Sequence, residues 1–275
     1  MQTNYHSIQA LSNSSLSVLK RSPAEFYARF IAKTMKSEET DAMRLGSAVH
    51  MLALEPERFH DHYVIETGPI NATTGKPYGR DTKRFEAWLD IRKTETSKTV
   101  LIYDEFESSM AIAEAFQSHP TIAAIMAANV EKIYERGYQM QYLVEGEQPI
   151  DIKCKPDCVI PSEALIIDLK TTSDPSPAAW RWSAEDFGYH RQAAIYLDAM
   201  ETFYGKPFRF LFGVVRSKAP YEVGVFELAQ ESIDRGRREY GSLIAEYTRR
   251  KATGDWLSDW QRDIATINVP ERKKW

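Results

Sequence analysis

The chain has 275 residues, and its 43% of hydrophobic and 27% of charged residues are typical of a globular protein with a sizeable core. No apolar run approaches the ~20 residues of a membrane span, and the N-terminus lacks a basic-then-apolar signal sequence, so we expect a cytoplasmic protein without membrane contact. The formal net charge of −4 does not indicate nucleic-acid binding, but local basic clusters around an acidic metal site remain compatible with it.

The first predicted elements are helices. Serine and asparagine caps open residues 12–30, which favour two short helices joined at Ser22-Pro23. Residues 42–59 follow with an apolar helix face, and His50 lies within or beside it. A lone histidine in such a face is more often a packed core residue than a metal ligand. A long polar loop over residues 66–80 and helices over 81–94, 103–118 and 121–128 complete this part of the chain.

Strands are predicted next. Residues 131–144 alternate between apolar and polar side chains, which is typical of a β-strand. This strand pairs through the polar turn 145–149 with a second predicted strand over residues 151–160. The sequence therefore changes from helices to an antiparallel sheet near residue 131.

A β-hairpin is predicted over residues 150–170. Residues 150–160 are rich in β-branched and apolar side chains, residues 161–163 signal a turn, and residues 164–170 form a short apolar run that ends in charge. If the turn is centred on its last two residues, Asp157 stands opposite Asp168. Cross-strand neighbours lie about 5 Å apart and like charges destabilise there, so a divalent cation would offset the two carboxylates.

Lys170 belongs to the same group of charges. Side chains two residues apart on a strand point to the same face, so Lys170 projects beside Asp168 while Leu169 enters the core. The ordinary alternative is a surface ion pair at a strand end. Ile166 and Ile167 favour a buried strand instead, and charges that leave a buried strand must be paired or bound to something.

The motif KPD at Lys155–Asp157, followed after ten residues by DLK at Asp168–Lys170, resembles the signature of the PD-(D/E)XK nuclease superfamily. Its surroundings are similar to the exodeoxyribonuclease VIII (RecE-type) branch, because the chain also has an Arg-Ser-Pro element and the pattern Gly-x-x-x-His before Leu-Glu-Pro-Glu-Arg-Phe. The resemblance extends over about residues 12–204. It implies an α+β fold with a restriction-endonuclease-like core, in which a central mixed, mainly antiparallel sheet is flanked by helices.

The same resemblance implies roles for the charged residues. Asp157, Asp168 and Lys170 would be catalytic. His50, Asp157, Asp168 and the backbone carbonyl of Leu169 would hold one or two divalent ions, and Mg²⁺ or Mn²⁺ suits such a mixture of oxygen and imidazole ligands. Lys170 would orient the attacking water or lower its pKa, and would counter developing charge.

An additional glutamate often lies near the first strand in this superfamily, and both Glu131 and Glu135 qualify. We favour Glu135, because it lies closer to the expected metal end of the sheet. An exposed strand glutamate without a function explains it equally well.

Candidate DNA contacts lie on a helix predicted over residues 187–204. Gln192 and Tyr196 are four residues apart and share a helix face, which the resemblance places against the site and the substrate. His190 and Arg191 are weaker candidates for phosphate contacts. Strands over 208–217 and 221–228 and a charged helix over 231–250 follow.

We expect residues 1–275 to form a single nuclease domain. Its parts would be a mainly helical segment with the metal-binding histidine (1–130), the sheet core with the catalytic hairpin (131–230) and a C-terminal helical tail (231–275).

The resemblance implies a metal-dependent exonuclease that digests linear double-stranded DNA from 5′ to 3′ and leaves 3′ single-strand tails for phage-type recombination. It also implies binding to DNA ends, a single-strand annealing protein as partner and a ring-like homo-oligomer. The alternatives are a non-catalytic module that binds DNA ends or a recombinase partner, a structural protein with a stabilising ion, an endonuclease, and a CRISPR-associated nuclease. The last often needs an iron–sulfur cluster, for which Cys154 and Cys158 alone are too few.

Overall fold

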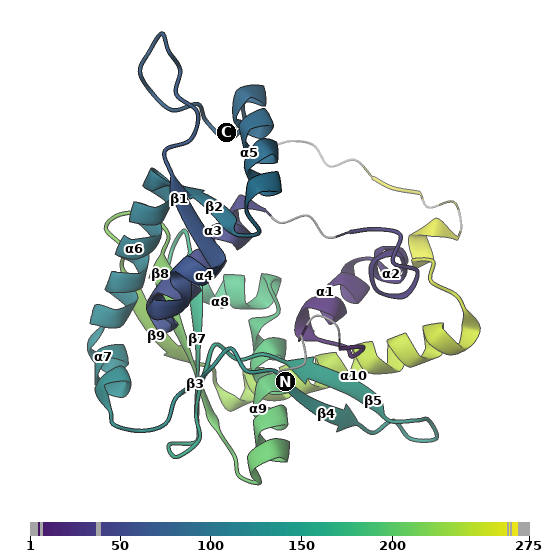
Figure 1. Cartoon of the computed structure of the whole chain (residues 1–275). Helices are drawn as coiled ribbons and strands as arrows, with labels where there is room; N and C mark the ends of the chain where they lie inside the picture. The colour runs from purple at the N-terminus through teal and green to yellow at the C-terminus, as the bar shows by residue number, and fades with distance from the viewer. Residues whose placement is uncertain (1–4, 6–7, 37–39, 263, 265, 269–275) are drawn as a thin grey trace.

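A computed structural model describes residues 5, 8–36, 40–262, 264 and 266–268. At its centre lies a five-stranded sheet in the order β3-β6-β7-β8-β9 (Figure 1). Its neighbouring strands are antiparallel except for β7 and β8, which are parallel, so the sheet is mixed and mainly antiparallel, as predicted. The strands are β3 (Ile133–Tyr134), β6 (Cys158–Ile160), β7 (Leu165–Thr172), β8 (Arg209–Arg216) and β9 (Val223–Glu227).

Helices cover both faces of this sheet, and the alternation of side chains along β7 shows why. Ile167 and Leu169 join one hydrophobic cluster, whereas Ile166 joins the other. Asp168 has the same parity as Ile166 and therefore points to that second face. The first face is covered by α3 (Asp41–Leu54), α6 (Tyr103–Ser118) and α7 (Pro120–Ala127), and the second core contains α1 (Asn13–Arg21), α8 (Pro177–Asp186), α9 (Tyr189–Tyr204) and α10 (Gln230–Thr253).

The N-terminal half also contains a small parallel pair of strands that was not predicted. β1 (Tyr63–Glu66) pairs with β2 (Thr99–Ile102), and a parallel partner so distant in the chain leaves no local pattern. The loop after β1 projects away from the body of the molecule (Figure 1) and is closed by a bridge between Ile70 and Pro77. The remaining elements here are α2 (Pro23–Phe26), a π-helical turn (Tyr27–Ile31), a 3₁₀ turn (Pro56–Arg58), α4 (Phe59–His62) and α5 (Lys83–Glu95).

The prediction of two continuous strands over residues 131–144 and 151–160 was wrong. The first is divided into β3 and β4 (Tyr138–Tyr142), and the second into β5 (Ile150–Cys154) and β6. β4 and β5 pair with each other in a separate antiparallel ribbon. The breaks fall where Glu135 has a left-handed φ of 49° and where Pro156 lacks an amide donor, and neither feature continues a ladder.

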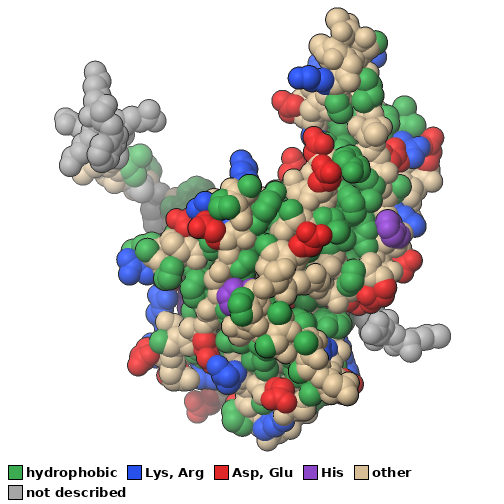
Figure 2. Space-filling model, turned by 90° about the vertical axis from the view of Figure 1, so that its left-hand side faces the viewer, with side chains coloured by type: hydrophobic (Ala, Val, Ile, Leu, Met, Phe, Trp, Pro, Cys, Tyr) green, Lys and Arg blue, Asp and Glu red, His purple; other side chains and the backbone are tan. Residues whose placement is uncertain are grey.

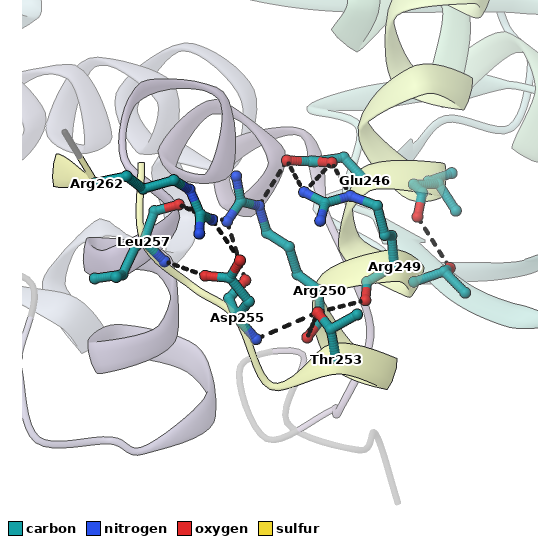
Figure 3. A network of polar contacts seen from close by, with 9 residues as sticks. Glu246, Arg249, Arg250, Thr253, Asp255, Leu257 and Arg262 are labelled. Carbon is teal, nitrogen blue, oxygen red and sulfur yellow. Dashed lines mark hydrogen bonds and ion pairs between the residues drawn. The ribbon is translucent and has the colours of Figure 1, made fainter. Parts of the chain in front are cut away.

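The segment after α10 is held against the end of that helix by the buried guanidinium group of Arg250 (Figure 3). Arg250 donates hydrogen bonds to the carbonyls of Asp255 and Leu257, at 3.0 and 2.8 Å. Trp256 then stacks on Phe26 of α2, with ring centroids 5.6 Å apart. The chain therefore returns to the N-terminal helices after α10, and a 3₁₀ turn (Asp259–Gln261) follows. The expected helical tail extends to residue 275, beyond the described residues, and the division of the chain into one domain with three parts stays a prediction.

The surface carries charges of both signs. Figure 2 shows acidic and basic side chains intermixed on the face that it presents, with hydrophobic side chains between them. This distribution agrees with the small net charge of −4. Within the described part of the chain, no helix combines the length and the apolar character needed to span a membrane.

Candidate metal centre and active site

The two strand breaks meet at one place and create the candidate site. The amide of Glu135 donates a hydrogen bond to the carbonyl of Asp157 at 3.2 Å, which joins the two breaks directly. One ligand atom each of Glu135, Asp157 and His50 lie within 4.8 Å of one another. Three groups that commonly bind metals therefore converge from three separate segments.

His50 reaches this place from α3. Its neighbours Ala48, Val49 and Leu52 are buried in the core, while about a quarter of the His50 side chain stays exposed. Nδ1 of His50 lies 3.3 Å from Oδ2 of Asp157. Burial alone would lower the pKa of His50, but the Asp157 carboxylate outweighs this effect and raises the pKa. The imidazole is thus directed at the acids of the hairpin and is not simply packed in the core.

The hairpin brings Asp157 and Asp168 together as its predicted register required. Cys158 pairs with Ile167, so the register continues to Asp157 opposite Asp168. The amide of Leu169 donates a 2.7 Å hydrogen bond to Oδ2 of Asp157. The backbone amide of Leu169 therefore contacts the site. Metal binding by the carbonyl of Leu169 stays a prediction.

The pKa values of these two acids are shifted in opposite directions. Burial and then the neighbouring Asp157 carboxylate raise the pKa of Asp168 to about 6. Burial would also raise the pKa of Asp157, but His50, Lys170 and the Leu169 amide together lower it. Such divergence between adjacent carboxyl groups is typical of functional sites.

Lys170 and Gln192 hold the second acid from two sides. Nζ of Lys170 forms an ion pair with Oδ1 of Asp168, and Nε2 of Gln192 donates a 2.8 Å hydrogen bond to Oδ2. Burial would lower the pKa of Lys170, but Asp168 and Asp157 raise it, so the amine is an ammonium ion at neutral pH. Its Nζ also lies 5.2 Å from the ring centroid of Tyr189, which sequence reasoning missed.

His50, Glu135 and Lys170 line a cleft with a volume of about 680 Å³, whereas Asp157 and Asp168 are buried and do not line it. Lys155 is another residue to which sequence reasoning gave no role, although it stands directly before Pro156 in the motif. Its Nζ forms an ion pair with Glu135. The cleft is lined by Met43, Gly46, Ser47, His50, Met51, Glu55, Arg58, His62, Tyr63, Tyr134, Glu135, Lys155 and Lys170.

Comparisons with known proteins agree with this arrangement. Residues 12–257 match a family described as a PDDEXK-like domain of unknown function. The chain belongs to this family. The predicted membership of the PD-(D/E)XK superfamily is thereby confirmed, and it supports a nuclease.

Solved structures give the fold of this PDDEXK-like chain further support. A candidate exonuclease from Eubacterium rectale has a similar fold, with a TM-score of 0.63 and 14% identity over 98% of this chain and 97% of that one. The core is therefore restriction-endonuclease-like and α+β, as predicted. A phage-related exonuclease from Haemophilus somnus, at 14% identity over 90% of this chain and 96% of that one, has a TM-score of 0.35, which is too low to support a shared fold. No curated protein matches the chain.

The donor set of this PDDEXK-like site fits a divalent cation. Glu135 and Asp157 offer carboxylate oxygens, and His50 offers an imidazole nitrogen, within 4.8 Å of one another. Asp168, which was also predicted as a ligand, lies outside this group, although the hairpin register places it opposite Asp157 and it pairs with Lys170. Nucleases of this superfamily depend on divalent metals, and these residues are suited to hold one.

The remaining predicted residues lie at different distances from the site. Tyr196 donates a 3.5 Å hydrogen bond to the carbonyl of Lys155, so it helps to fix the backbone of the Lys155–Asp157 motif. Glu131 is exposed and does not belong to the ligand group. His190 and Arg191 are buried at 1% and 2% exposure, so neither is available to DNA in this structure.

Proposed function

We propose that this protein is a metal-dependent exonuclease that hydrolyses linear double-stranded DNA from 5′ to 3′ and leaves 3′ single-strand tails. One observation supports this function above all others. An imidazole from α3 and an ammonium group two residues after the second hairpin acid line one cleft, and each contacts one of the two buried hairpin acids. Phosphodiester hydrolysis needs charge neutralisation, an activated water and stabilisation of the leaving oxygen, and this set of groups suits all three.

The proposed metal ligands are His50, Glu135, Asp157 and Asp168, with the carbonyl of Leu169 as a further candidate. When bound there, Mg²⁺ or Mn²⁺ would neutralise the phosphate and lower the pKa of a coordinated water.

We assign the other catalytic role to Lys170. Its raised pKa makes it a poor proton acceptor, so it acts as a charged hydrogen-bond donor that orients water and counters developing negative charge.

Gln192 and Tyr196 act behind these groups. The hydrogen bond from Gln192 fixes one oxygen of Asp168, and the one from Tyr196 reaches the backbone of Lys155. We propose that both residues also approach the DNA strand, as their places on one face of α9 suggest by analogy with related nucleases. Residues that orient groups in this way support a site even where they do not touch the reacting atoms.

The finer assignment depends on the sequence motifs. The resemblance to the RecE-type branch supports DNA ends as substrate, a single-strand annealing protein as partner, a ring-like homo-oligomer and a cytoplasmic location. A non-catalytic DNA-end binding module is the main competing function. The presence of His50, Asp157, Asp168 and Lys170 together argues against it.

End-labelled linear duplex DNA, compared with closed circular DNA, tests the proposal. We expect Mg²⁺ or Mn²⁺ to support release of mononucleotides from the linear DNA, a chelator to stop it, and the circular DNA to persist. Nicking of circular DNA would instead identify an endonuclease. Binding of linear DNA without nucleotide release under either metal would identify the non-catalytic module.

A further inference from the structure

Each carboxylate of the candidate site has a basic partner. Asp157 faces His50, Asp168 faces Lys170, and the third carboxylate, that of Glu135, faces Lys155. This pairing balances the charges of the acids without a metal. A dication that binds the same acids must therefore displace or repel at least one of these bases.

The pair between Lys155 and Glu135 is the most accessible of the three. The side chains of Lys155 and Glu135 are 33% and 24% exposed, compared with 16% and 1% for Lys170 and Asp168. Lys155 also lines the cleft. Its ammonium group can leave the carboxylate and enter solvent, whereas departure of Lys170 would leave the fully buried Asp168 without its charged partner.

The backbone of Lys155 is fixed, whereas its ammonium group is held only at the rim of the cleft, by the ion pair with Glu135 and at 6.0 Å from the ring centroid of Tyr5. The carbonyl of Lys155 accepts the hydrogen bond from Tyr196, and the rigid Pro156 follows directly. Asp157, the next residue, is held by the Leu169 amide. A displaced Lys155 side chain therefore swings from a fixed point at the edge of the cleft. The proposed substrate would bring a phosphate anion into this cleft, and a flexible ammonium group binds phosphate well.

We propose that Lys155 and the divalent metal compete for Glu135, and that Lys155, once displaced, binds a phosphate of the DNA strand in the cleft. This inference rests on the proposed nuclease function and adds a positioning residue to it. Because the DNA stabilises the displaced state, metal and DNA bind with positive coupling, and the coupling runs through Lys155.

Two measurements on the full chain test this coupling. The first is Mn²⁺ binding by calorimetry without DNA. The second is binding of a fluorescent duplex with phosphorothioate linkages throughout, which limits cleavage, with and without Mn²⁺. Lys155→Met keeps the aliphatic stem and removes the charge, and Lys155→Gln repeats the test with a polar side chain. Lys206→Met, which removes the same charge beside Phe208, is the matched control.

We expect Lys155→Met to bind Mn²⁺ about three- to tenfold more tightly than the wild type, because a competing cation has been removed. In the absence of metal, the same variant and the wild type should bind DNA with the same affinity. When Mn²⁺ is added, the variant should lose most of the gain in DNA affinity that the wild type shows. Lys206→Met should leave both the Mn²⁺ affinity and this gain unchanged.

Unchanged or weaker Mn²⁺ binding in both Lys155 variants, with wild-type melting temperatures, would overturn the competition. If the Lys155 variants bind Mn²⁺ more tightly but keep the full gain in DNA affinity that Mn²⁺ produces, the proposed contact between Lys155 and a DNA phosphate is wrong. A wild type that binds Mn²⁺ but cleaves no DNA would refute the proposed function alone, because the competition is measured without cleavage. A wild type that does not bind Mn²⁺ at all would refute both.

Discussion

Nε2 of Gln192 donates a 2.8 Å hydrogen bond to Oδ2 of Asp168, so the helix after the hairpin fixes a carboxylate of the candidate site. Asp168 is fully buried, and its other oxygen faces Lys170. Both oxygens are thus oriented before any substrate arrives. An acid held in this way has little freedom to adopt an unproductive rotamer, which is the structural meaning of a preorganised site.

Removal of this hydrogen bond should slow catalysis more than it weakens substrate binding. We expect Gln192→Leu to lower kcat on linear DNA by about 10- to 100-fold, the range seen when residues behind a metal ligand are changed. KM should change by less, because Gln192 is only 7% exposed and the residues that line the cleft are unchanged. Steady-state kinetics measure both, with Gln141→Leu on the exposed face of β4 as control. Equal losses in the two variants would show that Gln192 has no special role.

The hairpin charges should be indispensable for cleavage but not for folding. We expect Asp168→Ala and Lys170→Ala each to reduce nucleotide release by at least about a thousandfold, because each removes a charge on which the proposed chemistry depends. Circular dichroism should show the secondary structure of the wild type. Asp186→Asn, an exposed change at the end of α8, is the control. Wild-type activity in either alanine variant would refute the assigned role.

Glu135 and Glu131 offer a matched test of the ligand set. Glu135 lies within 4.8 Å of the other two ligand atoms, whereas Glu131 is exposed outside this group. We therefore expect Glu135→Gln to weaken Mn²⁺ binding by about tenfold or more, while Glu131→Gln leaves it unchanged. Calorimetric titration of both variants measures the difference. Similar affinities in the two variants would remove Glu135 from the site.

The register of the hairpin could be predicted from the sequence because it depends on local signals. A turn at residues 161–163 and two flanking apolar runs fix which residues stand opposite each other. His50 is different, since α3 and the hairpin are distant in the chain. Only the resemblance to a known family related them, and no pattern within α3 itself distinguishes a metal-binding histidine from a packed one.

The role of Lys155 could not be predicted because it depends on the broken strands. A continuous strand over residues 151–160 would have alternated its side chains across the sheet. The break at Pro156 and the left-handed conformation of Glu135 instead bring Lys155 and Glu135 together. Gly137 and Pro156 are visible signals of interruption, but a sequence does not show that two interruptions will face each other. The same limitation hid the parallel pairing of β1 with β2.

Buried ionic contacts away from the cleft predict how stability depends on pH. The carboxylate of Glu239 on α10 lies 2.8 Å from Nε2 of His190. It also forms ion pairs with Arg191 and, at 2.9 Å, with Lys20. His190, followed by Lys20 and Arg191, holds the pKa of Glu239 well below its ordinary value of 4.5, against the opposing effect of burial. The contacts join α1, α9 and α10 behind the helix that carries Gln192.

Because the folded pKa of Glu239 is lowered, its ionised form stabilises the protein above pH 4.5, and this contribution is lost as the pH falls further. We expect Glu239→Gln to reduce the free energy of unfolding by about 2 kcal/mol at pH 7, since it leaves the buried Arg191 without its charged partner. Urea denaturation at pH 7, 4 and 3 measures this free energy. The difference from the wild type should shrink as the pH falls below 4.5, because the Glu239 carboxylate of the unfolded wild-type chain then becomes protonated while the folded one stays ionised. Glu201→Gln on the exposed face of α9 should differ little from the wild type at any of these pH values. A gap that stays constant down to pH 3 would mean that the charge of Glu239 does not stabilise the contact of these three helices.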